Sequence, residues 1–304
     1  MAISQNRTTI QRDGLGSDCK MLFDDPVDLA APLARDFSER HCRIDPVSGE
    51  SCAWYHGALL VLRALRIGRG DVPGVHREFF DRALRQVPRE GNSISVLISG
   101  SADYLMPSLF LNTYSCIGML PHLTVVDICE TPLFMTTWYA VRHGIAVDVR
   151  HCDILAYEPE RPTDIVCTHH FFNYFARETR PNVVEQWRAL LRPGGRLLLV
   201  NRYRMLGQPP QGGYSEAECT ALVGSALTRM RQRTNGFPFS EREVEDMVRR
   251  YGARIRAQTL DSPGELLGLL QNGGFEIEAQ TIFSERRIGG ARTTESIGVV
   301  ARRL

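Results

Sequence analysis

The stretch "VLISGSADY", Val96 to Tyr104, is an apolar run of strand length that enters a turn at Gly100. Further apolar runs of similar length follow at 123–128, 145–150, 163–168 and 195–201, and segments with helix signals separate them. This alternation predicts a parallel sheet covered by helices. In such an α/β fold the turn at Gly100 lies at the carboxyl edge of the sheet, where ligands bind.

The last two apolar runs follow a different pattern. Residues 275–283 and 295–303 alternate between apolar and polar side chains, and a glycine-containing segment joins them. This predicts an antiparallel hairpin at the sheet edge. Together the runs predict a doubly wound, mostly parallel seven-stranded sheet that ends in an antiparallel hairpin.

The segments outside the sheet have helical signals. Residues 1–90 predict an N-terminal arm followed by a helical cap, and residues 91–304 predict the sheet domain. A helical lid insert is predicted at 205–260, where Ser215/Glu218 and Ser240/Glu243 have capping-box spacing. A third pair with this spacing, Ser262/Glu265, begins a late amphipathic helix.

Composition limits the classes of partner. Lys+Arg 36 and Asp+Glu 35 give a net charge of +1, which argues against a nucleic-acid partner and favours a small molecule. The N-terminus has no apolar signal core and no run is long enough to cross a bilayer, so we expect a cytoplasmic protein without membrane contact. The eight cysteines are scattered without a CxxC pair, so we expect reduced thiols and no metal site.

Two carboxylates follow successive strand ends downstream of the Gly100 turn. Asp127 ends the second run and could accept both ribose hydroxyls of a nucleotide, and Asp153 follows the third run. The turn lacks the later glycines that close approach to a pyrophosphate requires. The pattern therefore favours a nucleoside ligand without a pyrophosphate.

From about residue 90 to its end, the chain resembles the class I S-adenosylmethionine (SAM)-dependent methyltransferases. In the family, the loop reads acidic-x-Gly-x-Gly-x-Gly, and here residues 98–104 keep only Gly100, so Tyr104 has to point away from the cofactor or stack beside it. The resemblance implies SAM as cofactor, with Asp127 on the ribose and Asp153 and the Ile154 amide on the adenine. It places further cofactor-binding residues at Ser101, Ala102, Ile128 and Thr168.

The segment "THHFFNYF" at the end of the fourth strand supplies the candidate catalytic residues His169, His170 and Tyr174. Either imidazole could take a proton from a substrate hydroxyl. In extended backbone the two histidines would point apart, and no third ligand has a recognisable metal spacing. Phe171 and Phe175 are predicted to pack in the core.

Candidate substrate-binding residues come from the cap, the fourth strand and the fifth strand, and they are Tyr55, His56, Asn173, Asn201 and Tyr203. The adjacent lid insert suggests a closed pocket. The oligomeric state stays open, with a homodimer paired through the N-terminal helices as one option.

These features predict a SAM-dependent methyltransferase that modifies oxygen, nitrogen or carbon of a small molecule, in the biosynthesis of secondary metabolites. Methyl transfer is an in-line displacement, so the protein mainly positions the acceptor and excludes water. The alternative is an enzyme that consumes the aminocarboxypropyl arm of SAM and releases methylthioadenosine. It would be a cyclase that forms azetidine-2-carboxylate, or a transferase of the arm. The same adenosine site would serve both reactions.

Overall fold

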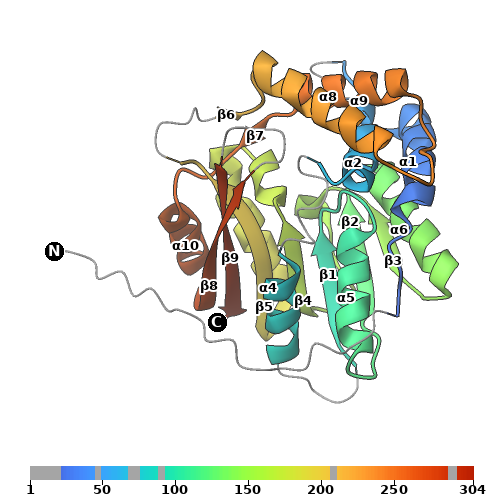
Figure 1. The fold of residues 1–304 in the computed structure, drawn as a ribbon. Helices are drawn as coiled ribbons and strands as arrows, with labels where there is room; N and C mark the ends of the chain where they lie inside the picture. The colour runs from blue at the N-terminus through green and yellow to red at the C-terminus, as the bar shows by residue number, and fades with distance from the viewer. Residues whose placement is uncertain (1–21, 45–48, 68–75, 88–92, 206–210, 287–292) are drawn as a thin grey trace.

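The computed structural model describes residues 22–44, 49–67, 76–87, 93–205, 211–286 and 293–304. Its centre is a seven-stranded sheet of order β3-β2-β1-β4-β5-β9-β8 (Figure 1). The strands are β1 (Ser95–Ser99), β2 (His122–Asp127), β3 (Asp148–His151), β4 (Thr163–His169), β5 (Leu191–Tyr203), β8 (Phe275–Arg286) and β9 (Thr293–Arg303). The first five run parallel, and β9 pairs antiparallel with both β5 and β8. The predicted α/β sheet and its terminal hairpin are confirmed.

Helices cover both faces of the sheet because successive strand residues point to opposite sides. Val96 and Ile98 of β1 join one apolar cluster with the helices α4 (Arg77–Gln86), α5 (Leu105–Ser115) and α6 (Glu130–His143). Leu97 joins the other cluster, with α7 (Arg180–Leu190) and α10 (Pro263–Asn272). Although α4 belongs to the N-terminal part of the chain, it packs against α5 beside the sheet.

The remaining helices gather above the carboxyl ends of β1 and β2 (Figure 1). They are α1 (Val27–His41) and α2 (Ala53–Ala64) from the N-terminal part, and α8 (Glu216–Arg231) and α9 (Glu241–Arg254) from the insert after β5. In the contacts between the two parts, α2 packs on α9, and Arg35 Nη1 donates to Glu243 Oε1 over 2.6 Å. A two-stranded ladder of β6 (Gln211–Gly212) and β7 (Ala257–Gln258) flanks α8 and α9. Segments far apart in sequence thus form one roof.

The helix starts agree with the predicted caps in two of three cases. Ser215 and Ser240 form complete capping boxes with Glu218 and Glu243. At α10, Ser262 accepts from the Glu265 amide, but the Glu265 carboxylate accepts from Arg180 and the Asp261 amide. The third capping box is therefore only half formed. The Glu265 carboxylate does not accept from the Ser262 amide, because it accepts from Arg180 and the Asp261 amide instead.

The short 3₁₀ helices η1 (Ile154–Ala156), η2 (Phe171–Tyr174) and η3 (Arg177–Thr179) follow β3 and β4. None of the described helices is both long and apolar enough to cross a bilayer. Six described cysteines are free, but Cys116 is disulfide-bonded. The expectation of reduced thiols throughout was wrong there, because spacing along the chain does not reveal which thiols meet in the fold.

Candidate functional site

A cavity of about 510 Å³ lies at the carboxyl ends of β1, β2 and β4, under the roof formed by α2 and α9. Its walls are the loop after β1, the tip of β2, the segment 169–174 at the end of β4, and residues of α2 and α9. This volume falls within the range of small-molecule sites, about 300–1,000 Å³. The sequence predicted this edge of the sheet as the site.

Gly100 occupies a backbone conformation that side chains rarely adopt, with φ at 72°. A Cβ atom there would lie 2.2 Å from Cδ2 of Phe171. From the sequence, we expected a glycine at position 100 because the backbone there would approach a ligand closely. In the structure, the ring of Phe171 fills the space beside Gly100, so the glycine lets the segment after β4 pack onto the loop after β1. Phe171 also lines the cavity, in addition to packing on the core.

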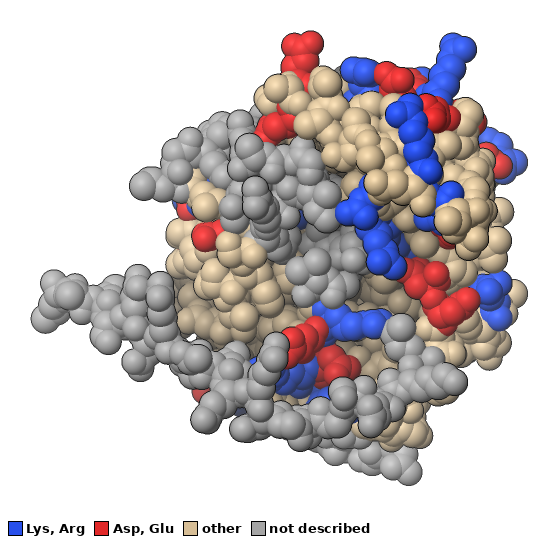
Figure 2. All heavy atoms as spheres, in the orientation of Figure 1, with Lys and Arg blue, Asp and Glu red and all other residues tan. Residues whose placement is uncertain are grey.

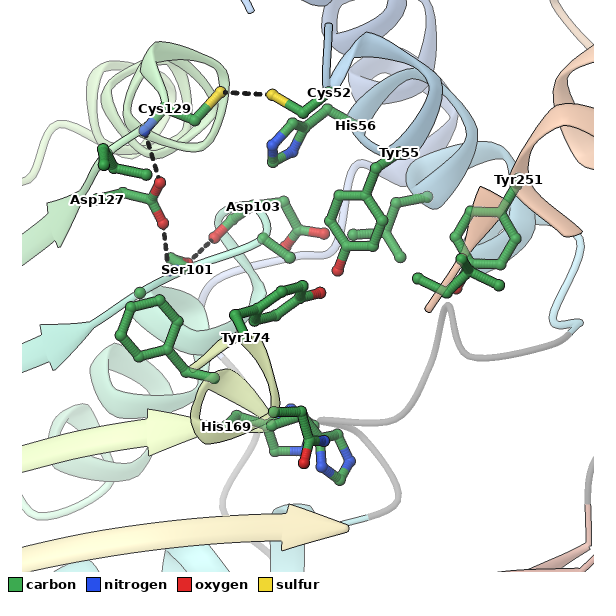
Figure 3. Close-up of a pocket in the computed structure, with 18 of the residues that line it drawn as sticks. Cys52, Tyr55, His56, Ser101, Asp103, Asp127, Cys129, His169, Tyr174 and Tyr251 are labelled. Carbon is green, nitrogen blue, oxygen red and sulfur yellow. Dashed lines mark hydrogen bonds between the residues drawn. The ribbon is translucent and has the colours of Figure 1, made fainter. Parts of the chain in front are cut away.

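Asp127, at the cavity wall, connects the loop after β1 with the residues after β2 (Figure 3). Its Oδ2 accepts from the Ser101 amide over 2.9 Å, and its Oδ1 accepts from the Cys129 amide over 2.8 Å. Burial raises the pKa of Asp127 to about 6, against the opposing effect of these two hydrogen bonds. Each carboxylate oxygen keeps a second lone pair for a ligand hydroxyl. Ile128, beside it, exposes 40% of its surface and offers an apolar contact.

Tyr104, which stands in place of the last glycine, and its neighbour Asp103 anchor the loop to the N-terminal part of the chain. Tyr104 is fully buried outside the cavity lining, stacks on Tyr139 at 4.7 Å and donates to Asp25 Oδ1 over 2.7 Å. Asp103 accepts from Nη1 of Arg63 with both oxygens, each at 2.9 Å. Arg63 belongs to α2, so a buried ion pair ties the loop to the roof.

The two histidines at the end of β4 both line the cavity, and a third histidine, outside the lining, contacts one of them. Nε2 of His169 lies 2.9 Å from Nδ1 of His76, a residue that precedes α4 and that the sequence did not indicate. His170 has φ at 56°, which turns the chain and leaves its ring 4.2 Å from that of His169. The expectation that these side chains point apart was wrong, because the backbone is not extended at His170. Burial, together with His76 and Arg202, lowers the pKa of His169 well below its usual value.

Three tyrosines from different elements form an aromatic wall (Figure 3). Tyr55 comes from α2, Tyr174 from η2 and Tyr251 from α9, and the Tyr55 and Tyr251 rings are 6.1 Å apart and nearly parallel. Burial raises the pKa of Tyr55 well above its usual value, and the neighbouring Tyr174 contributes. The capping-box spacing of Ser240 and Glu243 predicted a helix here, but it could not show that Tyr251 faces a cavity.

The structure brings most predicted site residues together. Those that line the cavity are Tyr55, His56, Gly100, Ser101, Ala102, Asp127, Ile128, His169, His170, Asn173 and Tyr174. Those outside the lining are Asp153, Ile154, Thr168, Asn201 and Tyr203.

Residues of this second group have structural contacts of their own. Asp153 is exposed and caps η1 through the Leu155 amide, while Ile154 and Thr168 are buried. Asn201 donates to Oδ1 of Asn173, and so supports a lining residue from behind. Tyr203 donates to Glu295 over 2.5 Å.

Three lining residues, Cys52, His56 and Cys129, form a sulfur-rich corner with Cys42. Contacts with Cys42 and Cys52 lower the pKa of the Cys129 thiol below its usual range, although burial opposes the shift. Burial lowers the pKa of His56, but Cys129 and Cys52 outweigh it and raise that pKa to about 10. Cys129 and His56 therefore shift each other's pKa in opposite directions, downwards for the thiol and upwards for the imidazole.

No protein-family model and no curated protein sequence matches the chain. Solved structures do match. A SAM-dependent methyltransferase from Methanosarcina mazei is 13% identical, with a TM-score of 0.50 over 73% of this chain and 96% of that chain. The [4+2]-cyclase SpnF is also 13% identical, with a TM-score of 0.50 over 91% of this chain and 93% of that chain.

The chain has the class I SAM-dependent methyltransferase fold. The likeness at 13% identity concerns this fold, so the chemistry has to come from the residues of the cavity. Those residues suit a nucleoside with a cationic centre. Asp127 offers an acceptor for hydroxyls, Ile128 an apolar surface, and the tyrosine wall a set of aromatic faces that attract a cation.

Proposed function

We propose that this protein binds SAM in the cavity and transfers its methyl group to a small molecule. The observation that carries the proposal is Asp127, a carboxylate held by two backbone amides at the cavity wall beside the Gly100 loop. When bound, SAM would supply a methyl group on positively charged sulfur, which needs no nucleophile from the protein. The tasks left to the chain are binding, orientation and exclusion of water.

Each wall of the cavity suits one of these tasks. Asp127 would accept the ribose hydroxyls, and the rings of Tyr55, Tyr174 and Phe171 would face the sulfonium. Three of the described arginines line the cavity and would attract the carboxylate of the methionine part of SAM. They are Arg202, Arg254 and Arg256. The roof of α2 and α9 limits access of water from that side.

His169 is the candidate for proton transfer. Its lowered pKa keeps the imidazole neutral at neutral pH, so it can accept a proton from a substrate hydroxyl. The hydrogen bond between Nε2 of His169 and Nδ1 of His76 fixes the ring orientation. An amine or carbon acceptor would need positioning alone.

The surface supports a small-molecule acceptor over a polyanion. On the face drawn in Figure 2, arginine side chains lie among acidic side chains, without a broad area of one charge between the grey regions. Arginines of the described residues are also paired with acids, such as Arg231 with Glu241 and Arg233 with Asp28. Nucleic-acid binding uses clustered unpaired cations.

The nucleoside products of two incubations separate methyl transfer from the alternative use of the aminocarboxypropyl arm. Purified protein is incubated with SAM alone and then with candidate acceptors, and the nucleoside product is identified by mass spectrometry. Acceptor-dependent S-adenosylhomocysteine is the expected result. Methylthioadenosine from SAM alone would reject methyl transfer in favour of a reaction on the arm. The fold alone does not decide between these outcomes, because the structures that match this chain include both a methyltransferase and a cyclase.

A further inference from the structure

Four side chains that can bind a metal meet where three helices begin or end. Cys42 follows α1, Cys52 precedes α2, and Cys129 precedes α6. His56 lies one turn after Cys52 on the same face of α2. One ligand atom from each of the four residues lies within 4.8 Å of all the others.

The sulfur positions match the edges of a metal tetrahedron. Sγ of Cys129 lies 3.6 Å from Sγ of Cys42. It also lies 3.6 Å from Sγ of Cys52 (Figure 3). Bonds of about 2.3 Å from zinc to sulfur place two ligand sulfurs about 3.8 Å apart in a tetrahedral site. All three cysteines are free, and 3.6 Å is far longer than the about 2.05 Å of a disulfide.

We propose that Cys42, Cys52, His56 and Cys129 bind one zinc ion in a tetrahedral Cys₃His site. Thiolate and imidazole ligands suit zinc, and four protein ligands leave no open position, so the site is structural.

The imidazole of His56 gives independent support. The residue is only 8% exposed, and Nδ1 has no hydrogen-bond partner among the described residues. A buried polar atom without a partner costs free energy, which coordination of the ion through Nδ1 would offset. The hydroxyl of Thr131, a residue that is 1% exposed, lies 3.1 Å from Sγ of Cys42. Hydrogen bonds of this kind orient the ligands of metal sites.

The site would fasten the N-terminal helices to the sheet. The sulfurs of Cys42 and Cys52 come from the ends of α1 and α2, whereas Cys129 lies just after the tip of β2. The Cys129 amide also donates to Asp127, so the ion would hold in place the residue that orients this carboxylate. Because Cys52, His56 and Cys129 line the cavity, the metal would form one corner of its wall.

The spacing along the chain could not reveal this site. Nine residues separate Cys42 from Cys52, and Cys129 follows His56 only after a long stretch that includes β1, α5 and β2. The absence of a CxxC pair led to the expectation of no metal site. We now replace that expectation with the proposal.

Metal analysis tests the proposal without any activity measurement. The untagged full chain is produced with zinc in the medium, dialysed under reducing conditions and analysed by plasma mass spectrometry. Wild type should contain about one zinc per chain. Cys129→Ser and His56→Ala should lose most of it. The control Cys219→Ser removes a buried free thiol on α8 and should keep it.

Cobalt substitution tests the same proposal if a ligand variant does not fold. Cobalt-loaded wild type should show thiolate-to-cobalt charge transfer and the strong visible absorption of a tetrahedral ion. Absence of the charge-transfer band would overturn the proposal. Zinc retained undiminished in folded Cys129→Ser would overturn it too, as would a wild-type protein without metal whose three thiols all react with a thiol reagent or form a disulfide.

Discussion

Replacement of Gly100 by alanine tests how the two loops of the cavity wall pack. With φ at 72°, alanine has to adopt a conformation that costs an L residue about 1–2 kcal/mol. Its Cβ would also lie 2.2 Å from the Phe171 ring, which has to shift by roughly 1 Å to reach ordinary contact. Forced overpacking costs about 1–3 kcal/mol, so Gly100→Ala should lower the free energy of unfolding by about 2–5 kcal/mol.

Chemical denaturation measures this loss, and Gly144→Ala is the matched control. Gly144 ends α6 with φ at 64°, and a Cβ atom added there would meet nothing within 4 Å among the described residues. Its variant should therefore lose only the conformational part, about 1–2 kcal/mol. In the background of Phe171→Ala, the cost of Gly100→Ala should fall to that of the control. Equal costs for the two glycine variants, or an unchanged cost in the Phe171→Ala background, would refute the reasoning.

Other predictions concern the ion pair, the histidine pair and a residue outside the lining. Arg63→Leu leaves Asp103 buried without its partner and should cost about 3–5 kcal/mol in denaturation, whereas Arg63→Leu/Asp103→Leu should recover part of it. Burial lowers the pKa of His169, so only the unfolded chain gains a proton there below about pH 6.5, and stability should fall as the pH falls. His169→Gln should flatten that slope, and an equal slope would contradict the assignment. Tyr203→Phe removes a hydrogen bond to Glu295 outside the cavity lining and should leave SAM affinity unchanged, which calorimetry checks.

The sheet could be predicted from the sequence because its signals are local. Apolar runs of strand length mark each strand, and the capping boxes at Ser215 and Ser240 mark helix starts within a few residues. The parallel order then follows from the covering helices, and it brings Gly100 and Asp127 to one edge. The positions of Gly100 and Asp127 depend only on where the strands end, so a single sequence is enough to predict them.

The rest of the site depends on contacts between distant segments. His76 reaches His169 across 93 positions, and Tyr251 joins the wall because α9 packs on α2. The left-handed backbone at His170 has no sequence signal, since this conformation is rare for residues other than glycine. The sequence correctly predicted that Asp153 and Asn201 lie near the carboxyl edge of the sheet. It could not show that neither residue lines the cavity.

Calorimetric titration with SAM tests the central claim most directly. Wild type should bind SAM, and Asp127→Asn should bind about 10-fold to 100-fold more weakly, because hydrogen bonds to a charged group contribute about 1.5–3 kcal/mol. Asp153→Asn, outside the lining, should lose less affinity than Asp127→Asn. Circular dichroism verifies that each variant is folded. Wild type that does not bind SAM, or folded Asp127→Asn that binds it as tightly as wild type, would contradict the account.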